Sequence, residues 1–470
     1  MVFSSNLFVF GFMPIFFSAY YLMPRVPKNA LILFASLAFY AFGAGSVVIV
    51  LVLSILVNYV AARAIEVSQG RAREVVFGLA VTANLLALFH YKYFNFAWQV
   101  ADSVSGDALT RSGLTAPQVL LPIGISFFTF QAVSYVADVF TRHTAAERSL
   151  VRFGMYHSLF PQLIAGPIVR YVEIRKEIAC RDVTLIEVTE GLTRFTIGLA
   201  KKTIIADHAG QIADAVFGLG ADRITPALAW LGAIAYGVQI LFDFAGYSDM
   251  AIGLGRLLGF HFPENFADPY TSRSMAEFWR RWHMTLSRWF RDYLYIPLGG
   301  NRRGPIRTYV NLLVVFFLCG LWHGAGYTFI AWGLFHGAFL AGERFVLHRW
   351  NVAPRGLLGQ VYTLAAVTTG WVLFRSGTLA QAAVFLKAMA WLGPRGQDWA
   401  DAVALLPRDR ACYLVIGIIL AVVPMRKMLT VPAPRPTGLA LQRAATLLLF
   451  IYAAAMLSEG TFNPFIYFRF

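Results

Sequence analysis

Residues 47–62 read Val-Val-Ile-Val-Leu-Val-Leu-Ser-Ile-Leu-Val-Asn-Tyr-Val-Ala-Ala, an uncharged and mainly apolar run that suits lipid better than water. Comparable runs recur at residues 119–140, 228–260 and 309–321. A membrane-spanning helix needs about 20 mainly apolar residues. A transmembrane β-barrel would instead show segments of about ten residues that alternate apolar and polar side chains, and no such alternation is present. The pattern therefore predicts an all-α integral membrane protein.

The composition of the whole chain agrees with this prediction. Hydrophobic residues make up 58% of the 470 positions and charged residues only 14%, against roughly 25% charged residues in a soluble domain. The net charge of +15 could suggest a nucleic-acid partner, but the basic residues fall in short connections between apolar runs. Such an excess of Lys and Arg is typical of cytoplasmic loops. We therefore expect a lipid bilayer around the protein and no nucleic acid.

The basic residues also predict an orientation for the first half of the chain. The run 7–23 has neither a basic segment ahead of it nor a small-residue cleavage site, so we expect it to stay as a span rather than be removed as a signal peptide. Its N-terminus is then outside the cell membrane and Arg25 and Lys28 are inside. The following connections alternate, with residues 43–46 and 91–118 outside and residues 63–74 and 141–152 inside.

We expect one membrane domain over residues 1–470, with about 10 to 13 membrane helices. The candidate spans are 7–23, 29–44, 46–64, 74–95, 119–140, 150–168, 186–205, 226–258, 308–322, 325–347, 358–375, 411–425 and 439–458. The polar, aromatic and arginine-rich stretch 260–307 interrupts them, and we interpret it as a cytoplasmic, interfacial or re-entrant segment. Three widely separated cysteines, Cys180, Cys319 and Cys412, indicate neither a disulfide framework nor a zinc site, and no metal is expected.

Residues 277–294 have the spacing of an amphipathic helix. Aromatic and apolar side chains recur at intervals of three, four and seven, whereas the arginines fall largely on the other side. The aromatic face is made by Trp279, Trp282, Leu286, Trp289, Phe290 and Tyr293. The arginines Arg280, Arg281, Arg288 and Arg291 could attract phosphate groups, or they could only obey the rule that cytoplasmic loops are basic. The segment could equally be an interfacial anchor.

Histidines inside apolar sequence are candidates for chemistry, because a polar side chain is costly in a membrane. His323 follows the run 309–321 within Leu-Trp-His-Gly-Ala-Gly, about 16 residues or roughly 24 Å into a helix that begins near Arg307. Neutral imidazole can take a proton from a hydroxyl group. A hydrogen-bonded packing histidine is the alternative. His283 is our preferred partner, since His336 would lie about 20 Å from His323 on one continuous helix, and only a break at residues 324–326 could bring them together.

An acidic side chain also lies inside apolar sequence. Gln239, Asp243 and Tyr247 are spaced by four and share a helix face. They form either a polar seam between helices or part of a polar substrate path.

These motifs together resemble the membrane-bound O-acyltransferase (MBOAT) family, in the branch that contains the membrane subunit of bacterial alginate O-acetylase. The resemblance rests on residues 121–131, 160–171, 243–255, 278–287, 322–324 and 465–470, which span nearly the whole chain in the family's order. It implies about a dozen helices around a transmembrane tunnel. His323 corresponds to the family's essential histidine, and His283 to its second recurrent polar position.

The resemblance also implies an activity. His323 would act as general base on an acceptor hydroxyl that attacks the thioester of acetyl-coenzyme A, and His283 or a backbone amide beside Gly324 would stabilise the charge on the carbonyl oxygen. Trp322, Gly324, Trp279, Trp282, Asp243 and the four arginines would bind substrate or donor. The product would be an acetylated alginate or similar exopolysaccharide, made in the bacterial inner membrane with a periplasmic acceptor or transferase protein.

Other functions stay open from the sequence. Relatives with the same motifs act on peptidoglycan or cellulose, or transfer D-alanine to teichoic acid. A transporter or flippase would also carry intramembrane His and Asp, although its inverted repeats are not found. A structural subunit would tolerate replacement of His323.

Overall fold

The computed structural model describes residues 2–23, 25, 27–114, 119–350, 355–394, 398–424, 436–459 and 465. Throughout these residues the regular structure is helical and contains no strand, which confirms the all-α prediction. Residues 115–118, Met425 and residues 466–470, which belong to predicted segments, lie outside the described part. The helices group into two compact units, one of Met1–Val188 with Leu254–Pro263 and one of Thr189–Gly253 with Glu264–Phe470.

Six helical stretches of the described residues are long and apolar enough to cross a membrane. They are Lys28–Val67, Gly70–Val104, Pro226–Leu257, Pro305–His323, Gly356–Arg375 and Ala440–Glu459. Shorter apolar helices lie at Leu7–Leu22, Ile125–Phe140 and Leu379–Met389. The protein is therefore a multi-pass membrane protein, while the total of 10 to 13 spans stays a prediction.

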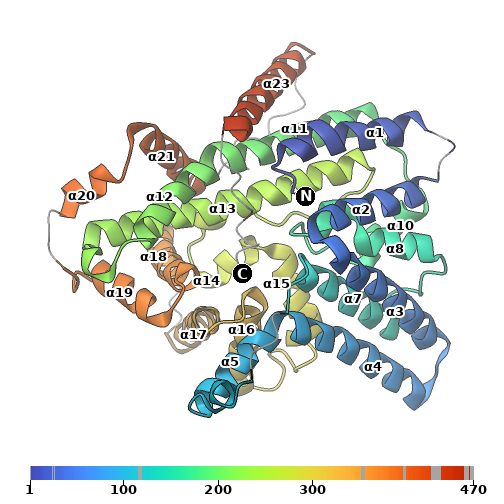
Figure 1. Ribbon diagram of the computed structural model, residues 1–470, viewed down its shortest axis with the longest axis horizontal. Coiled ribbons are helices and arrows are strands. Elements are labelled where there is room, and N and C mark those ends of the chain that lie inside the picture. Colours follow the sequence, from blue (N-terminus) through green and yellow to red (C-terminus); the bar gives the residue numbers. More distant parts are fainter. Residues whose placement is uncertain are drawn as a thin grey trace. The chain divides into compact units, whose positions relative to one another are not determined.

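The first unit consists of helices from the N-terminal part of the chain (Figure 1). They are η1 (Leu7–Phe12), α1 (Met13–Leu22), α2 (Lys28–Ala44), η2 (Gly45–Val47), α3 (Val48–Val67), α4 (Gly70–Leu88), η3 (Phe89–Tyr93), α5 (Phe94–Val104), α6 (Ala108–Arg111), α7 (Ile125–Phe140), α8 (Leu150–Ser158), α9 (Phe160–Leu163) and α10 (Tyr171–Ala179). A reciprocal amide pair ties α3 to α4, because Asn58 and Asn84 donate to each other's side-chain oxygens at 3.1 and 2.7 Å. Away from water, such pairing removes the cost of burying two amides.

The second unit carries the histidine and arginine motifs. Its helices are α11 (Leu185–Ala200, which begins in the first unit), η4 (Lys201–Ala206), α12 (Asp207–Phe217), η5 (Ala221–Arg223), α13 (Pro226–Leu257, whose end belongs to the first unit), η6 (Pro269–Thr271), α14 (Met275–Arg281), α15 (Met284–Phe290), η7 (Arg291–Tyr295), α16 (Pro305–His323), α17 (Tyr327–Trp350), α18 (Gly356–Arg375), α19 (Leu379–Met389), α20 (Asp398–Ala404), α21 (Arg408–Val422) and α23 (Pro436–Glu459).

Helices α16 and α17 pack as a close hairpin within this unit. The chain leaves the helix at Gly324, whose backbone is extended, and resumes it at Tyr327. A Cβ on Gly320 would collide with the carbonyl oxygen of Phe329, and a Cβ on Gly333 with that of Phe316. Small residues at these points let the two backbones approach each other closely. In lipid, where no hydrophobic driving force acts between helices, such close packing is what holds helices together.

The predicted single helix over residues 277–294 is wrong. Helix α14 ends at Arg281 and α15 begins at Met284, with His283 between them in the left-handed conformation at φ 42°. Trp279, Trp282 and Trp289 are buried inside the unit, so this aromatic face packs against other parts of the protein. The helical spacing is interrupted because side-chain hydrogen bonds to the turn replace those of a continuous helix.

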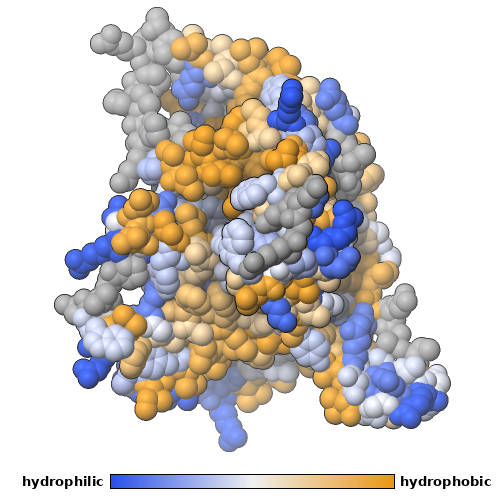
Figure 2. Space-filling model, turned by 90° about the vertical axis from the view of Figure 1, so that its left-hand side faces the viewer, coloured by the Kyte–Doolittle hydropathy of each residue, from blue (hydrophilic) through white to orange (hydrophobic). Residues whose placement is uncertain are grey.

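Large hydrophobic side chains are exposed on the outer surfaces of the helices, as expected where lipid is the solvent. Figure 2 shows them spread over much of the face that carries α19, α20 and α21. The exposed residues of these three helices and their connections include Leu379, Trp391, Leu392, Trp399, Val403, Val415, Ile416 and Ile419.

Candidate active site

His323 is the last residue of α16, and 3% of its surface is exposed. The following Gly324 permits a close contact, because a Cβ at this position would collide with the ring of Phe329. Trp322 and Trp332 lie against the imidazole of His323, with ring centroids 4.9 and 5.0 Å away. The predicted helix from the Arg307 region to His323 is confirmed, and its glycine break places the histidine at a helix end.

His283 occupies the turn between α14 and α15 and is also buried. The side-chain oxygen of Asn265 lies 3.1 Å from His283 Nδ1 and accepts hydrogen bonds from Thr285 N and Oγ1 at 3.3 and 2.9 Å. The amide nitrogen of Asn265 donates to Ser248 Oγ at 3.0 Å. Phe244 covers the imidazole ring edge to face at 4.6 Å. Asn265 therefore positions both the turn and the histidine.

These contacts assign a tautomer to His283. Since the oxygen of Asn265 can only accept, Nδ1 carries the proton and Nε2 presents a lone pair. Burial lowers the pKa of His283 to about 3, so the ring is neutral near pH 7. Within the described residues Nε2 has no hydrogen-bond partner. In this tautomer Nε2 can accept a proton but cannot donate one to a carbonyl oxygen.

The structure brings the two predicted histidines to the same indole. The ring of Trp322 lies 6.0 Å from His283 and 4.9 Å from His323, measured between centroids. His283 comes from the α14–α15 turn and His323 from the end of α16, so the arrangement depends on tertiary packing. Trp322 itself is 3% exposed and is a shared neighbour of the two imidazoles.

His336 lies closer to this group than a continuous helix would allow. The break at residues 324–326 reverses the chain, so α17 runs back along α16. Trp332 consequently contacts both His323 and His336, each at 5.0 Å between ring centroids. The expectation that His336 is far from His323 on one continuous helix is therefore wrong. The helix break at residues 324–326, which the sequence left open as the alternative, is present in the structure.

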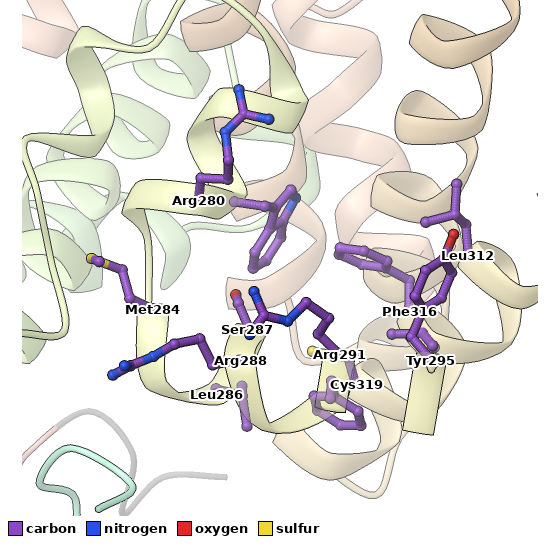
Figure 3. A pocket seen from close by; sticks show the side chains of 13 residues that line it. Arg280, Met284, Leu286, Ser287, Arg288, Arg291, Tyr295, Leu312, Phe316 and Cys319 are labelled. Carbon is purple, nitrogen blue, oxygen red and sulfur yellow. The ribbon is translucent and has the colours of Figure 1, made fainter. Parts of the chain in front are cut away.

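A pocket of about 490 Å³ opens between α14, α15, η7 and α16 (Figure 3). It is named the arginine pocket here because Arg280, Arg288 and Arg291 line it. Most of its remaining lining is apolar or weakly polar: Trp279, Met284, Leu286, Ser287, Phe290, Tyr295, Leu312, Val315, Phe316 and Cys319. Its size is within the range of about 300 to 1,000 Å³ that is usual for ligand sites.

The predicted binding residues divide between the arginine pocket and other places. Arg281 lies outside the lining, since its guanidinium is held by Glu277 at 2.6 Å and Thr271 at 2.9 Å. Trp282 is buried against Trp371, with ring centroids 4.9 Å apart. Trp322 and Gly324 do not line the pocket either. The pocket lining does include Arg280, Arg288, Arg291 and Trp279.

Asp243 belongs to a separate polar cluster. Its carboxylate lies 3.1 Å from Lys202 Nζ, which also donates to Asp207 at 2.7 Å. The contacts correspond to the polar seam between helices rather than to a place in the arginine pocket.

Sequence reasoning missed Asn265, Lys202 and Cys319. Asn265 lies 18 positions before His283, and no local spacing reveals such a pairing. Cys319 is buried, lines the arginine pocket and precedes His323 by one helical turn. The helix spacing of four residues between Cys319 and His323 was the one available signal.

The sequence also matches known proteins. Residues 34–356 match the model of the MBOAT, membrane-bound O-acyltransferase, family. A protein named probable alginate O-acetylase AlgI from Pseudomonas putida is 40% identical over 494 residues, covering 100% of both chains. The protein of the same name from Azotobacter vinelandii is 40% identical over 511 residues, again covering 100% of both. The peptidoglycan O-acetyltransferase of Helicobacter pylori is 34% identical over 438 residues, which cover 83% of this chain and 80% of that protein.

Proposed function

The chain belongs to the membrane-bound O-acyltransferase family, and we propose that it transfers acetyl groups from acetyl-coenzyme A to a polysaccharide. As a member of that family it is an O-acyltransferase in a membrane. The names of its relatives, alginate O-acetylase and peptidoglycan O-acetyltransferase, support an acetyl donor and a polysaccharide product. Alginate or a similar exopolysaccharide is the acceptor that we propose.

One observation carries the proposal: the arginine pocket ends within one helical turn of the proposed catalytic histidine. Arg280 is exposed and Arg288 is half-buried, so cationic groups stand where phosphate groups of a donor can reach them. Arg291 is also exposed, but its guanidinium is paired with Asp292 at 2.6 Å. Cys319 lines the same pocket on α16, four residues before His323. A donor held by its phosphates can therefore direct its thioester toward His323.

In the proposed reaction, His323 removes the proton of an acceptor hydroxyl. The hydroxyl oxygen bonds to the thioester carbonyl carbon, the carbon–sulfur bond breaks, and the protonated imidazole returns the proton to the leaving thiolate. The developing negative charge on the carbonyl oxygen needs a hydrogen-bond donor. The tautomer of His283 does not supply one, so we assign this role to a backbone amide of the 324–327 turn. Through Trp322, His283 positions the base.

We further propose that the protein lies in the bacterial inner membrane and hands acetyl groups to a periplasmic acceptor or transferase protein. The polysaccharide is outside the cytoplasm and the donor is inside, so the acyl group must cross the membrane. The immediate acceptor is then a hydroxyl group of either the partner or the polymer. Both acceptors use the same chemistry at His323.

The proposal is tested with inverted membrane vesicles that contain the protein and acetyl-coenzyme A labelled in the acetyl group. Vesicles are supplied with either alginate or peptidoglycan fragments in the lumen, each with and without a periplasmic extract. Base-labile label on alginate supports the proposal. Label on peptidoglycan alone contradicts the proposed polymer, and release of no free coenzyme A in any mixture contradicts the donor.

A further inference from the structure

His336 is a fully buried histidine that the proposed reaction does not use. Its imidazole meets the indole of Trp279, on α14, at 5.1 Å between ring centroids and 86° between ring planes. It meets the indole of Trp332, one helical turn earlier on α17, at 5.0 Å and 70°. Both are edge-to-face arrangements, which aromatic rings favour over a face-to-face sandwich. One imidazole therefore packs against two indoles from different helices.

The two indoles belong to different parts of the proposed active site. Trp279 lines the arginine pocket, where we place the donor. Trp332 lies against the imidazole of the proposed base, His323, at 5.0 Å between ring centroids. The indoles also contact each other, at 5.7 Å. Because close-packed side chains have little room to move independently, a displacement of His336 disturbs the donor pocket and the base together.

A third helix also contacts His336. Helix α18 approaches the imidazole at Gly370, where a Cβ would lie only 2.6 Å from Nε2. A residue larger than glycine at this position would force the imidazole to move. One helical turn later, α18 places Phe374 against His323, at 5.2 Å between ring centroids. The fit of the imidazole beside a glycine therefore contributes to the spacing of α14, α17 and α18 around the proposed base.

The contacts of His336 are made by its ring rather than by hydrogen bonds. Neither ring nitrogen has a hydrogen-bond partner among the described residues, and burying polar atoms without partners is unfavourable. What this side chain supplies is a small, flat ring in contact with two indoles. We propose that His336 is a positioning residue for acetyl transfer, which holds Trp332 against His323 and Trp279 in the wall of the arginine pocket. The inference rests on the proposed function.

The first test measures kcat and KM for acetyl-coenzyme A, per folded protein, in the full chain and in His336→Ala. Removing the ring lets both indoles shift, so kcat should fall at least about 10-fold and KM should rise about threefold or more. A role in folding alone would lower the yield of folded protein but change neither constant.

Phe339→Ala is the matched control for the loss of a ring from α17. Phe339 lies nearly one turn beyond His336, and its ring contacts Phe335 and Tyr362 rather than the two indoles. Its replacement should leave kcat and KM within about twofold of the values for the unaltered protein. A loss as large as that of His336→Ala would overturn the inference, because any cavity on α17 would then have the same effect.

The second test displaces the imidazole without replacing it. In Gly370→Ala the added methyl group presses on Nε2, so kcat/KM should fall at least about 10-fold. In the His336→Ala background the same methyl group enters the space that the ring has left, so the further change should be less than about twofold. Equal losses in both backgrounds would show that the effect does not pass through His336, and would overturn the inference.

If His336→Ala does not fold, Gly370→Ala decides alone. Unchanged kcat and KM in either variant, with transfer by the unaltered protein intact, would overturn the inference and leave the proposed function standing. Failure of the unaltered protein to transfer acetyl from acetyl-coenzyme A would overturn the proposed function itself, and the inference with it.

Discussion

The side chain of Asn265 determines which nitrogen of His283 carries a proton, and therefore what His283 can do. Asn265 directs its oxygen at Nδ1 because its amide nitrogen is engaged by Ser248. A buried neutral imidazole with Nε2 as an acceptor can orient a neighbour or receive a proton. It cannot stabilise an oxyanion, which is the role that sequence reasoning allowed for it.

Burial of His283 also makes the stability of the protein depend on pH. Its pKa falls to about 3 in the folded state, against about 6.5 when unfolded. Between these two pKa values only the unfolded chain binds the proton. The contribution of the neutral, buried His283 to the free energy of unfolding is therefore fully present above pH 6.5 and is lost as the pH falls. From pH 7 to pH 5 the loss should approach about 2 kcal/mol. Melting curves in detergent at both pH values should show a smaller drop in melting temperature for His283→Asn than for the unaltered protein. An equal drop would contradict a depressed pKa.

The arginines of the pocket predict an effect on donor affinity. Arg288→Gln removes a half-buried cation from the lining, so the KM for acetyl-coenzyme A should rise about tenfold while kcat changes little. Arg281→Gln is the matched control, since Arg281 is bound to Glu277 and Thr271 and should leave KM unchanged. Steady-state kinetics at low salt make the comparison. A fall in kcat at constant KM for Arg288→Gln would contradict the assignment.

At the scale of elements, the break between α14 and α15 places the arginine pocket. The heptad-like spacing of residues 277–294 predicts one helix, and each half is helical as predicted. The break depends on Asn265, whereas the carboxylate of Glu343 holds the start of α14, where it accepts from the N–H groups of Met275 and Ala276 at 2.6 and 3.0 Å. Both partners are distant in sequence, so local periodicity could not reveal the break.

Replacing Asn265 should therefore destabilise the turn. In Asn265→Ala the donors at Thr285 N and Oγ1 lose a buried acceptor, which costs about 1 to 3 kcal/mol for an unsatisfied group. Thr369→Ala on α18 is a suitable control, because its exposed hydroxyl bonds only to Ala365 of the same helix. Chemical denaturation in detergent compares the two. A loss for Asn265→Ala no larger than the control would show that the turn does not need this side chain.

At the scale of the whole molecule, the sequence predicted the helical class, the multi-pass character and the family from apolar runs and motifs that are contiguous. His323 was identified because a histidine inside an apolar run is conspicuous. The side chains around it were not identified, because Trp279, Trp332 and His336 meet only through tertiary packing. The division into two compact units also involves residues 254–263 returning to the N-terminal helices, which composition does not indicate.

The distribution of basic residues predicts which loops face the cytoplasm. Single cysteines are introduced at exposed Ser46 and Gln69, at opposite ends of α3, in a chain with Cys180 and Cys412 changed to serine. A membrane-impermeant maleimide added to spheroplasts should label Ser46→Cys, and in inverted vesicles it should label Gln69→Cys. The reversed pattern would contradict the predicted orientation.

The central claim, that His323 is the base for acetyl transfer, is tested most directly by comparing the protein with His323→Ala. Labelled acetyl-coenzyme A measures transfer, and donor-dependent protection of Cys319 from a small thiol reagent measures binding in the Cys180 and Cys412 serine background. We predict that His323→Ala loses transfer by at least about 100-fold while Cys319 stays protected. Transfer within a few-fold of the unaltered protein, with equal protection, would contradict the account.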